Sequence, residues 1–233
     1  ADDPYESIVG KSITGIRRRA KYIIIDLDQG ALLVHLRMTG KLTPVAPEKH
    51  VTVMLHFETG NTLYFQDTRK FGRMEYVNNP MEKLAHLGPE PLADDFTPEV
   101  FYKMLRSKNR QIKPLLLDQT FLAGLGNIYV DEALFQAGIQ PLSIAASIPK
   151  RQSMSLHAAI QSILSASIKA QGTTILNFSH GENESGTYQA ALQVYGRKDE
   201  PCLVCETPIT KITVGQRGTH FCSSCQSLFK AKR

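Results

Sequence analysis

The sequence predicts an α+β multidomain protein: an antiparallel β domain, then a helical domain, then a small zinc ribbon. Three observations support this. Alternating apolar segments fill residues 11–77, helical periodicity replaces them after about residue 80, and the four cysteines of the chain all lie within residues 202–225. A hydrophobic fraction of 42% suits sizeable cores, and a charged fraction of 21% excludes a disordered chain. No run of eighteen apolar residues is present, so no membrane-spanning helix is predicted.

The β domain is predicted from short strands separated by turn signals. Asp28-Gln29-Gly30 and the segment 58–61 are typical of turns between paired strands. The predicted strands cover residues 11–18, 22–27, 31–36, 51–57, 62–65 and 71–77. No helix separates them, which favours an antiparallel sandwich or barrel over a βαβ unit.

The helical domain begins with a capping signal. Thr97 offers an N-cap hydroxyl, Pro98 follows at the first helical position, and Glu99 places an acid in the first turn. Further helices are predicted over residues 111–117, 127–136 and 153–170. Residues 177–187 are polar and lack periodicity, so they form either a loop that caps a ligand or a solvated connector.

The four cysteines predict the third domain. Cys202-x2-Cys205 and Cys222-x2-Cys225 are separated by sixteen residues. Two such knuckles bring four thiolates to the corners of a tetrahedron, which is the geometry that Zn2+ prefers. Two disulfides in a secreted domain are the alternative, but no signal-peptide pattern accompanies them and the spacing suits zinc better. The intervening residues predict a β-hairpin, so we expect one structural zinc ion and a ribbon.

An excess of positive charge predicts an anionic partner. The net charge is +5. In the ribbon, basic residues outnumber acidic ones. The acidic residues are Asp199, Glu200 and Glu206, and the basic residues are Arg197, Lys198, Lys211, Arg217, Lys230, Lys232 and Arg233. A zinc hairpin with this excess is expected to bind an anion such as a phosphate backbone.

A second basic stretch, residues 17–22, leads into an apolar strand. It is either a solvated basic edge or a row that faces phosphates. Regular strand alternation places Arg17, Arg19 and Lys21 on one face. Neighbouring cations would lower the pKa of Lys21, which would suit it to proton transfer.

Three further stretches have both a structural and a functional interpretation. Met38 and Phe71, each at a turn beside cations, are either partly buried filler or apolar wedges that enter a base stack. Gly124-Leu125-Gly126-Asn127 opens a helix and is either a tight turn or an anion site at free N–H groups. A lone G-x-G is weak evidence, and no strand precedes it, so it predicts no dinucleotide site.

Taken together, these stretches resemble bacterial formamidopyrimidine-DNA glycosylases, the 8-oxoguanine repair family. The matching segments occur in order through nearly the whole chain. They are RRRAKY (17–22), HLRMTGKL (35–42), PEKH (47–50), DTRKFGR (67–73), HLGPEPL (86–92), IKPLLLDQ (112–119), GLGNIYVDEALFQAGI (124–139), QGTT (171–174), LQVYGRK (192–198) and GQRGTHFC (215–222).

The resemblance implies three domains around a DNA cleft. They are a β-sandwich in residues 1–78, a helix–two-turn–helix domain in residues 79–190 with a lesion-capping loop at 177–187, and a zinc-finger ribbon in residues 191–233. It implies a bifunctional enzyme of base-excision repair, which removes oxidised purines and then cleaves the abasic strand by β,δ-elimination. The implied partner is double-stranded DNA that contains oxidised purines, and the implied protein is a monomer in the bacterial cytoplasm, associated with the nucleoid.

The resemblance also implies roles for individual residues. Lys21 is similar to the proton donor of β-elimination, and Arg217 to the arginine of the δ-elimination step. DNA-contacting positions correspond to His50, Arg69, Lys108 and Asn127. The three residues that fill the gap left by a flipped base correspond to Met38, Arg69 and Phe71. The implied metal ligands are Cys202, Cys205, Cys222 and Cys225.

The start of the chain departs from the family pattern. The family begins with Pro-Glu after removal of Met, and the proline amine is its nucleophile. Here the sequence begins Ala1-Asp2-Asp3-Pro4, so the nucleophile and its adjacent acid are not assigned, and we expect a chain that lacks the N-terminal segment. The alternatives are a lesion-binding protein without catalysis and an endonuclease VIII-like glycosylase for oxidised pyrimidines.

Overall fold

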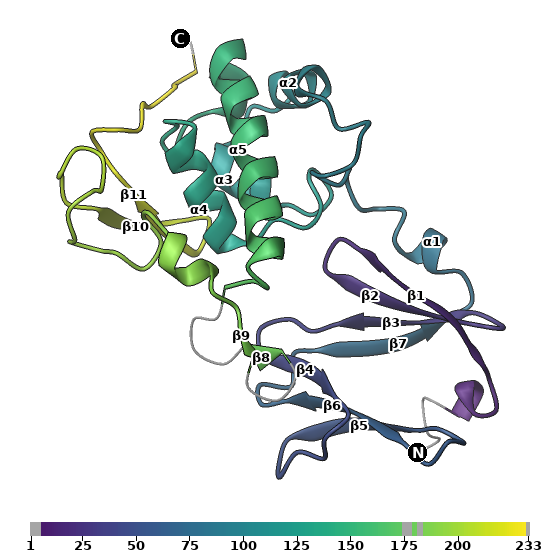
Figure 1. Cartoon of the computed structure of the whole chain (residues 1–233). Helices are drawn as coiled ribbons and strands as arrows, with labels where there is room; N and C mark the ends of the chain where they lie inside the picture. Colours follow the sequence, from purple (N-terminus) through teal and green to yellow (C-terminus); the bar gives the residue numbers. More distant parts are fainter. Residues whose placement is uncertain (1–5, 174–178, 181–183, 232–233) are drawn as a thin grey trace. The chain divides into compact units, whose positions relative to one another are not determined.

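The computed structural model describes residues 6–173, 179–180 and 184–231, and for the pairs 179–180 and 184–185 it describes only the backbone. The chain divides into two compact units (Figure 1). The first comprises residues 1–86 and 175–185, and the second comprises residues 87–174 and 186–233. Residues 177–178 and 181–183 of the predicted 177–187 loop lie outside the described residues. Between and beside them, β8 (Ser179–His180) and β9 (Glu184–Ser185) form a short antiparallel pair.

Residues 13–77 of the first unit form two antiparallel sheets. One has the order β1-β2-β3-β7, formed by β1 (Ile13–Arg19), β2 (Tyr22–Leu27), β3 (Ala31–His35) and β7 (Arg73–Val77). The other has the order β4-β6-β5, formed by β4 (Gly40–Thr43), β6 (Thr62–Asp67) and β5 (Val51–His56). A 3-10 turn (Glu6–Ile8) precedes the sheets, and α1 (Pro80–Lys83) follows them.

Both sheets contribute to one apolar core, so the β domain is a sandwich. Ile25, Leu32 and Val34 come from the first sheet, and Phe65 comes from the second. Leu42 and Leu55 of the second sheet pack against these buried side chains. The predicted antiparallel architecture is confirmed, and the open choice between sandwich and barrel is resolved.

The predicted hairpins of the sandwich occur, but the sequence did not predict the sandwich strand β4. The predicted turn around Met38 forms at residues 37–39, and the strand β4 then starts at Gly40. This strand has only four residues and Pro44 follows directly, so its periodicity is too short to detect. A side chain at Gly40 would overlap the carbonyl of Leu36, which explains why the tight turn needs glycine there.

The second unit contains four helices of six or more residues among those described. They are α2 (Pro98–Arg106), α3 (Ile112–Leu117), α4 (Asn127–Gln136) and α5 (Lys150–Lys169). The Thr97 hydroxyl accepts a hydrogen bond from Val100 N, as the capping signal predicts. The helix α5 begins three residues before the predicted Ser153, because Pro149 serves as its N-cap. Short 3-10 turns occupy residues 145–147 and 188–191.

The helices enclose the largest apolar cluster of the second unit, and the ribbon packs on α4. Phe101 of α2, Leu116 of α3, Leu134 of α4 and Ile160 of α5 all lie in this cluster. The ribbon consists of the antiparallel strands β10 (Thr210–Val214) and β11 (Arg217–Phe221), which the sequence predicts as a hairpin. No described helix has the length and apolar character needed to cross a membrane.

Candidate functional site

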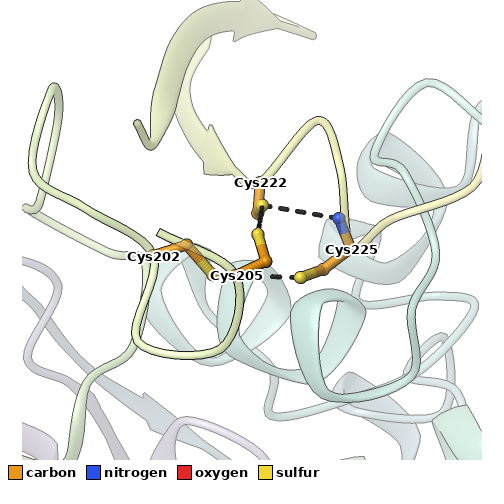
Figure 2. Close-up of side chains that lie close together, drawn as sticks. All are labelled: Cys202, Cys205, Cys222 and Cys225. Carbon is orange, nitrogen blue, oxygen red and sulfur yellow. Dashed lines mark hydrogen bonds between the residues drawn. The ribbon is translucent and has the colours of Figure 1, made fainter. Parts of the chain in front are cut away.

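The four cysteines converge in the second unit. Their sulfur atoms all lie within 4.8 Å of one another. The Sγ atoms of Cys202 and Cys225 are 3.9 Å apart, and those of Cys205 and Cys222 are 3.4 Å apart. Figure 2 shows the side chains approaching one point from two separate knuckles.

The residues present fit a zinc ion. Zinc–sulfur bonds of about 2.3 Å in a tetrahedron place neighbouring sulfur atoms about 3.8 Å apart, close to the observed spacings. Backbone N–H groups also point at the sulfurs, from Val204 to Cys202 at 3.5 Å and from Cys225 to Cys222 at 3.4 Å. Such bonds stabilise thiolates, which are the ligands that zinc requires. The chain therefore has one structural zinc site.

A buried carboxylate of α4 anchors the segment that leads into the ribbon. The carboxylate oxygens of Glu132 accept hydrogen bonds from the backbone N–H groups of Gln193, Val194 and Tyr195 at 2.8–3.0 Å. Burial raises the pKa of Glu132 above its ordinary value, although the three hydrogen bonds oppose this shift. The ribbon is thus tied to the helical core by a side chain that no sequence motif identified.

The tip of the ribbon hairpin carries Arg217, which is exposed. The carbonyl of its neighbour Gly218 accepts hydrogen bonds from Asn127 Nδ2 at 3.0 Å and from Lys113 Nζ at 3.1 Å. Asn127 Oδ1 is buried and has no hydrogen-bond partner within the described part of the chain. The structure therefore brings Asn127, at the start of α4, together with the hairpin tip, more than ninety residues further along the chain.

Lys108 lies in the loop after α2 and is exposed. It lines a cavity of about 390 Å³ together with Ser107, Arg110 and Asp118. Arg110 donates to the Asp118 carboxylate at 3.0 Å, so the charge of that arginine is partly compensated. Lys108 has no such carboxylate partner among the described residues, which leaves its charge available to an anion.

Three exposed side chains of the first unit form a cluster, which we call the wedge cluster: Met38, Arg69 and Phe71. Arg69 donates to Met38 Sδ at 3.2 Å, and its guanidinium carbon lies 5.1 Å from the centre of the Phe71 ring. Met38 is 60% exposed and Phe71 is 55% exposed. Neither side chain belongs to the apolar core, so the exposure favours the wedge interpretation over partly buried filler.

The buried carboxylate of Asp67 holds the two turns of the wedge cluster. It accepts hydrogen bonds from the Thr39 hydroxyl, from Arg69 N at 3.2 Å and from Gly72 N at 2.6 Å. Burial raises the pKa of Asp67, but the hydrogen bonds from Thr39 and from the backbone outweigh burial and hold the pKa below its ordinary value. Asp67 N also donates to the carbonyl of His50. His50 directly precedes β5 and is exposed.

Lys21 lies in the tight turn between β1 and β2, rather than on a strand. Arg19 pairs with Tyr22, and Ala20 between them has a φ of +51°. The alternation argument for Lys21 is therefore wrong, because the strand ends before this residue. Arg17 of the same basic stretch already has a partner, since its guanidinium donates to the Asp26 carboxylate at 2.7 and 3.0 Å.

The structure adds His35 to the surroundings of Lys21. The edge of its ring packs against Tyr22, and its Nδ1 accepts from Arg37 N at 3.0 Å. Burial, together with the positive charges of Arg37, Lys21 and Arg73, lowers the pKa of His35 to about 4. His35 is thus neutral near pH 7 with its Nε2 protonated, a donor among cations, which suits an anion. The sequence contains no local signal for this role.

Comparisons with known proteins agree with this arrangement. Residues 1–74 match the formamidopyrimidine-DNA glycosylase N-terminal domain, residues 87–179 match the H2TH (helix–two-turn–helix) domain of that enzyme, and residues 199–228 match the zinc finger found in FPG and IleRS. The formamidopyrimidine-DNA glycosylase of Cytobacillus firmus is 44% identical over 94% of this chain and 83% of its own length. That of Herpetosiphon aurantiacus is 45% identical, covering 95% and 84%.

Solved structures give the same result. A Lactococcus lactis FPG mutant in complex with Fapy-dG-containing DNA has a TM-score of 0.87 and 40% identity, over 95% of this chain and 84% of that one. MutM (FPG) from Thermus thermophilus has a TM-score of 0.87 and 37% identity, over 93% and 84%. A β-sandwich, an H2TH domain and a four-cysteine zinc finger define a class of base-excision DNA repair glycosylases. Within that class, the chain belongs to the formamidopyrimidine-DNA glycosylase family.

The predicted family membership and fold class are confirmed. Each relative and structure named above is a formamidopyrimidine-DNA glycosylase. The endonuclease VIII-like alternative is therefore not favoured.

Proposed function

We propose that this chain removes 8-oxoguanine and formamidopyrimidines from duplex DNA and then cleaves the abasic strand by β,δ-elimination. The main support for this proposal is the wedge cluster. Solved relatives are described in complex with Fapy-dG-containing DNA, carbocyclic 8-oxo-G-containing DNA and abasic-site DNA. The chain is similar to those proteins through 95% of its length.

The wedge cluster fits the demands of base extrusion. Flipping a nucleotide leaves a gap in the stack and costs a few kcal/mol, least at a damaged pair. Exposed Met38 and Phe71 offer apolar surface that can enter the gap, and Arg69 between them offers a planar group with hydrogen-bond donors. Asp67 holds the two turns that carry Met38 and Phe71, and both side chains lie outside the apolar core of the sandwich.

Lys21 is proposed as the proton donor in β-elimination. In this class an amine attacks C1′ of the sugar and forms an iminium, which acidifies C2′ and permits strand cleavage. The neutral His35 lies within the influence of the positive charges of Lys21, Arg37 and Arg73, and this arrangement suits a bound phosphate. A phosphate at this cluster would place the lysine close to the sugar whose bonds are broken.

The second unit is proposed to supply the remaining contacts. Arg217 would act in δ-elimination, while Asn127 and Lys108 would hold phosphates, with His50 of the first unit doing the same on its side. The exposed guanidinium at a hairpin tip and the uncompensated charge of Lys108 support these roles. We further propose that the protein acts as a monomer in the bacterial cytoplasm, associated with the nucleoid, since the relatives named are bacterial.

Borohydride trapping tests the proposal. We expect a covalent adduct when the chain is mixed with borohydride and a duplex that contains 8-oxoguanine, and none with the undamaged duplex. An intact-mass measurement of the natural protein identifies its first residue, since the nucleophile is not assigned. A missing adduct, together with a mass that equals residues 1–233, would favour the lesion-binding alternative over the enzyme.

A further inference from the structure

A buried ion pair joins α3 and α4 directly beneath the ribbon hairpin. Lys113 Nζ lies 2.6 Å from Asp131 Oδ1, and both side chains are fully buried. Burial lowers the pKa of Lys113, Asp131 opposes this, and the charge of Arg217 lowers the pKa further. The positive charge of Arg217 is therefore close enough to act on the pair.

Lys113 and Asp131 each make a further hydrogen bond, and both bonds go to the ribbon hairpin. Lys113 Nζ also donates to the carbonyl of Gly218 at 3.1 Å. Asp131 Oδ2 accepts from His220 N at 2.9 Å. The contacts lie one and three residues after Arg217, on the strand that this arginine begins. At the turn itself, Gly215 has a φ of +55° and closely approaches Pro114, the neighbour of Lys113.

Stability alone gives a poor account of this pair. A buried ion pair often contributes no more than a well-packed apolar pair of similar volume, because removing two charges from water is costly. The apolar residues on both sides of it, Ile112 and Leu115 in α3 and Val130 and Leu134 in α4, are already fully buried. An apolar pair could join the two helices, but it could not bind both a carbonyl and an N–H of β11.

The zinc site lies too far from Arg217 to hold the hairpin tip in place. The cysteine knuckle adjoins the far end of β11, where Phe221 precedes Cys222. At about 3.3 Å per residue, Arg217 lies roughly 13 Å along the strand from Phe221. A two-stranded ribbon is weakly stable alone, so its tip needs a separate support.

We propose that Lys113 and Asp131 are positioning residues that fix the hairpin tip, and with it Arg217, through contacts separate from the zinc ligands. The proposal rests on the DNA-binding function proposed for Arg217. Zinc holds the base of the ribbon, Glu132 holds the entry to the ribbon, and the ion pair holds the tip. Adjacent acids of α4, Asp131 and Glu132, thus fix two different parts of one small domain.

The test uses the full chain and a double variant, Lys113→Met with Asp131→Leu, which removes both charges at similar volume. A matched control, Lys83→Met with Glu75→Gln, removes the exposed pair joined at 2.6 Å in the first unit. Zinc content is measured in both. Hydrogen exchange then reports on the amides of residues 216–220, and binding to a duplex with a tetrahydrofuran abasic analogue is measured with and without Arg217→Ala.

We expect the double variant to keep one zinc and to exchange the amides of residues 216–220 at least about tenfold faster, while the control does not. Arg217→Ala should weaken DNA binding at least about fivefold in the unaltered chain and less than about twofold in the double variant. Unchanged exchange, or a loss of DNA binding of about fivefold or more on Arg217→Ala in both backgrounds, would overturn the proposal.

Two outcomes are separated by this design. If Arg217→Ala does not affect DNA binding in the unaltered chain, the function proposed for Arg217 fails, while hydrogen exchange still decides whether the pair orders the tip. If the double variant does not fold, the test uses the single variant Asp131→Asn, which keeps the shape of the side chain. The same faster exchange is then expected, and unchanged exchange again overturns the proposal.

Discussion

At the scale of single residues, Asp67 is the side chain on which the wedge cluster depends. We expect Asp67→Asn to lower the free energy of unfolding by about 1–3 kcal/mol at pH 7, because an amide oxygen replaces a charged acceptor and the amide NH2 faces donors. The folded-state pKa of Asp67 lies below its ordinary value, so its stabilising effect is present above about pH 4 and is lost as the pH falls through the folded-state pKa. Denaturant unfolding from pH 7 to pH 3 measures the difference.

Glu58→Gln is the control for this prediction, since Glu58 lies exposed in a turn. It should change stability by less than about 0.5 kcal/mol. A pH-independent difference between Asp67→Asn and the unaltered chain would contradict the hydrogen-bonding role of the charged form.

His35 gives a second prediction at this scale. Its imidazole should titrate near pH 4 in the folded chain, because burial and the charges of Arg37, Lys21 and Arg73 disfavour the protonated ring. In the unfolded chain its pKa is about 6.5. The unfolded state therefore binds the proton first, and the contribution of His35 to stability falls as the pH drops from about 6.5 to 4. An NMR titration with its midpoint at the ordinary histidine value would rule out the proposed neutral donor.

The site residues that the sequence predicted lie in continuous motifs, whereas those that it did not predict act through burial and long-range contacts. Lys21, Arg69 and Arg217 were reached through the family resemblance, because each lies within a short continuous motif of the sequence. Asp67, His35 and Asp131 act through burial or through contacts with residues as far as 89 positions away, and no local pattern encodes these. Arg17 is not the free cation that the sequence suggests, because its partner Asp26 lies on the next strand.

At the scale of elements, the zinc ribbon is the clearest case of a fold that a ligand completes. Removing zinc with a chelator should unfold residues 199–228 and abolish tight DNA binding, because structural zinc supplies about 10–16 kcal/mol in comparable peptides. Hydrogen exchange and metal analysis follow the ribbon, and gel-shift titration follows the DNA. The helices α2 to α5 have their own apolar core and should remain folded. Tight binding that persists after verified zinc loss would disprove this dependence.

Elements were predicted where periodicity was long or a cap was explicit. The strands β2 and β3 alternate or are apolar throughout, and α2 begins at Thr97-Pro98 with the expected capping bond. The strand β4 and the helix α1 have four residues each, too few for a period to appear. The start of α5 was missed because Pro149, a residue without a capping side chain, precedes it.

At the scale of the whole molecule, charge predicts how DNA binding responds to salt. About five phosphate contacts should give a slope of about −4 to −5 for log K against log salt. Lys108→Met should make the slope less negative by about 1 and weaken binding to all sequences alike. Lys103→Met, an exposed lysine of α2 with no assigned role, is the matched control. A flat salt response would contradict binding through a phosphate-facing surface.

The central claim, that the chain excises oxidised purines, is tested most directly by single-turnover base release with enzyme in excess. Duplexes that contain 8-oxoguanine opposite cytosine, an oxidised pyrimidine, or no lesion are compared at equal concentrations. We expect release of 8-oxoguanine with a nick in the same strand, and slower or no release from the other two duplexes. No release of 8-oxoguanine from a fully bound duplex, or faster release of the oxidised pyrimidine, would contradict it.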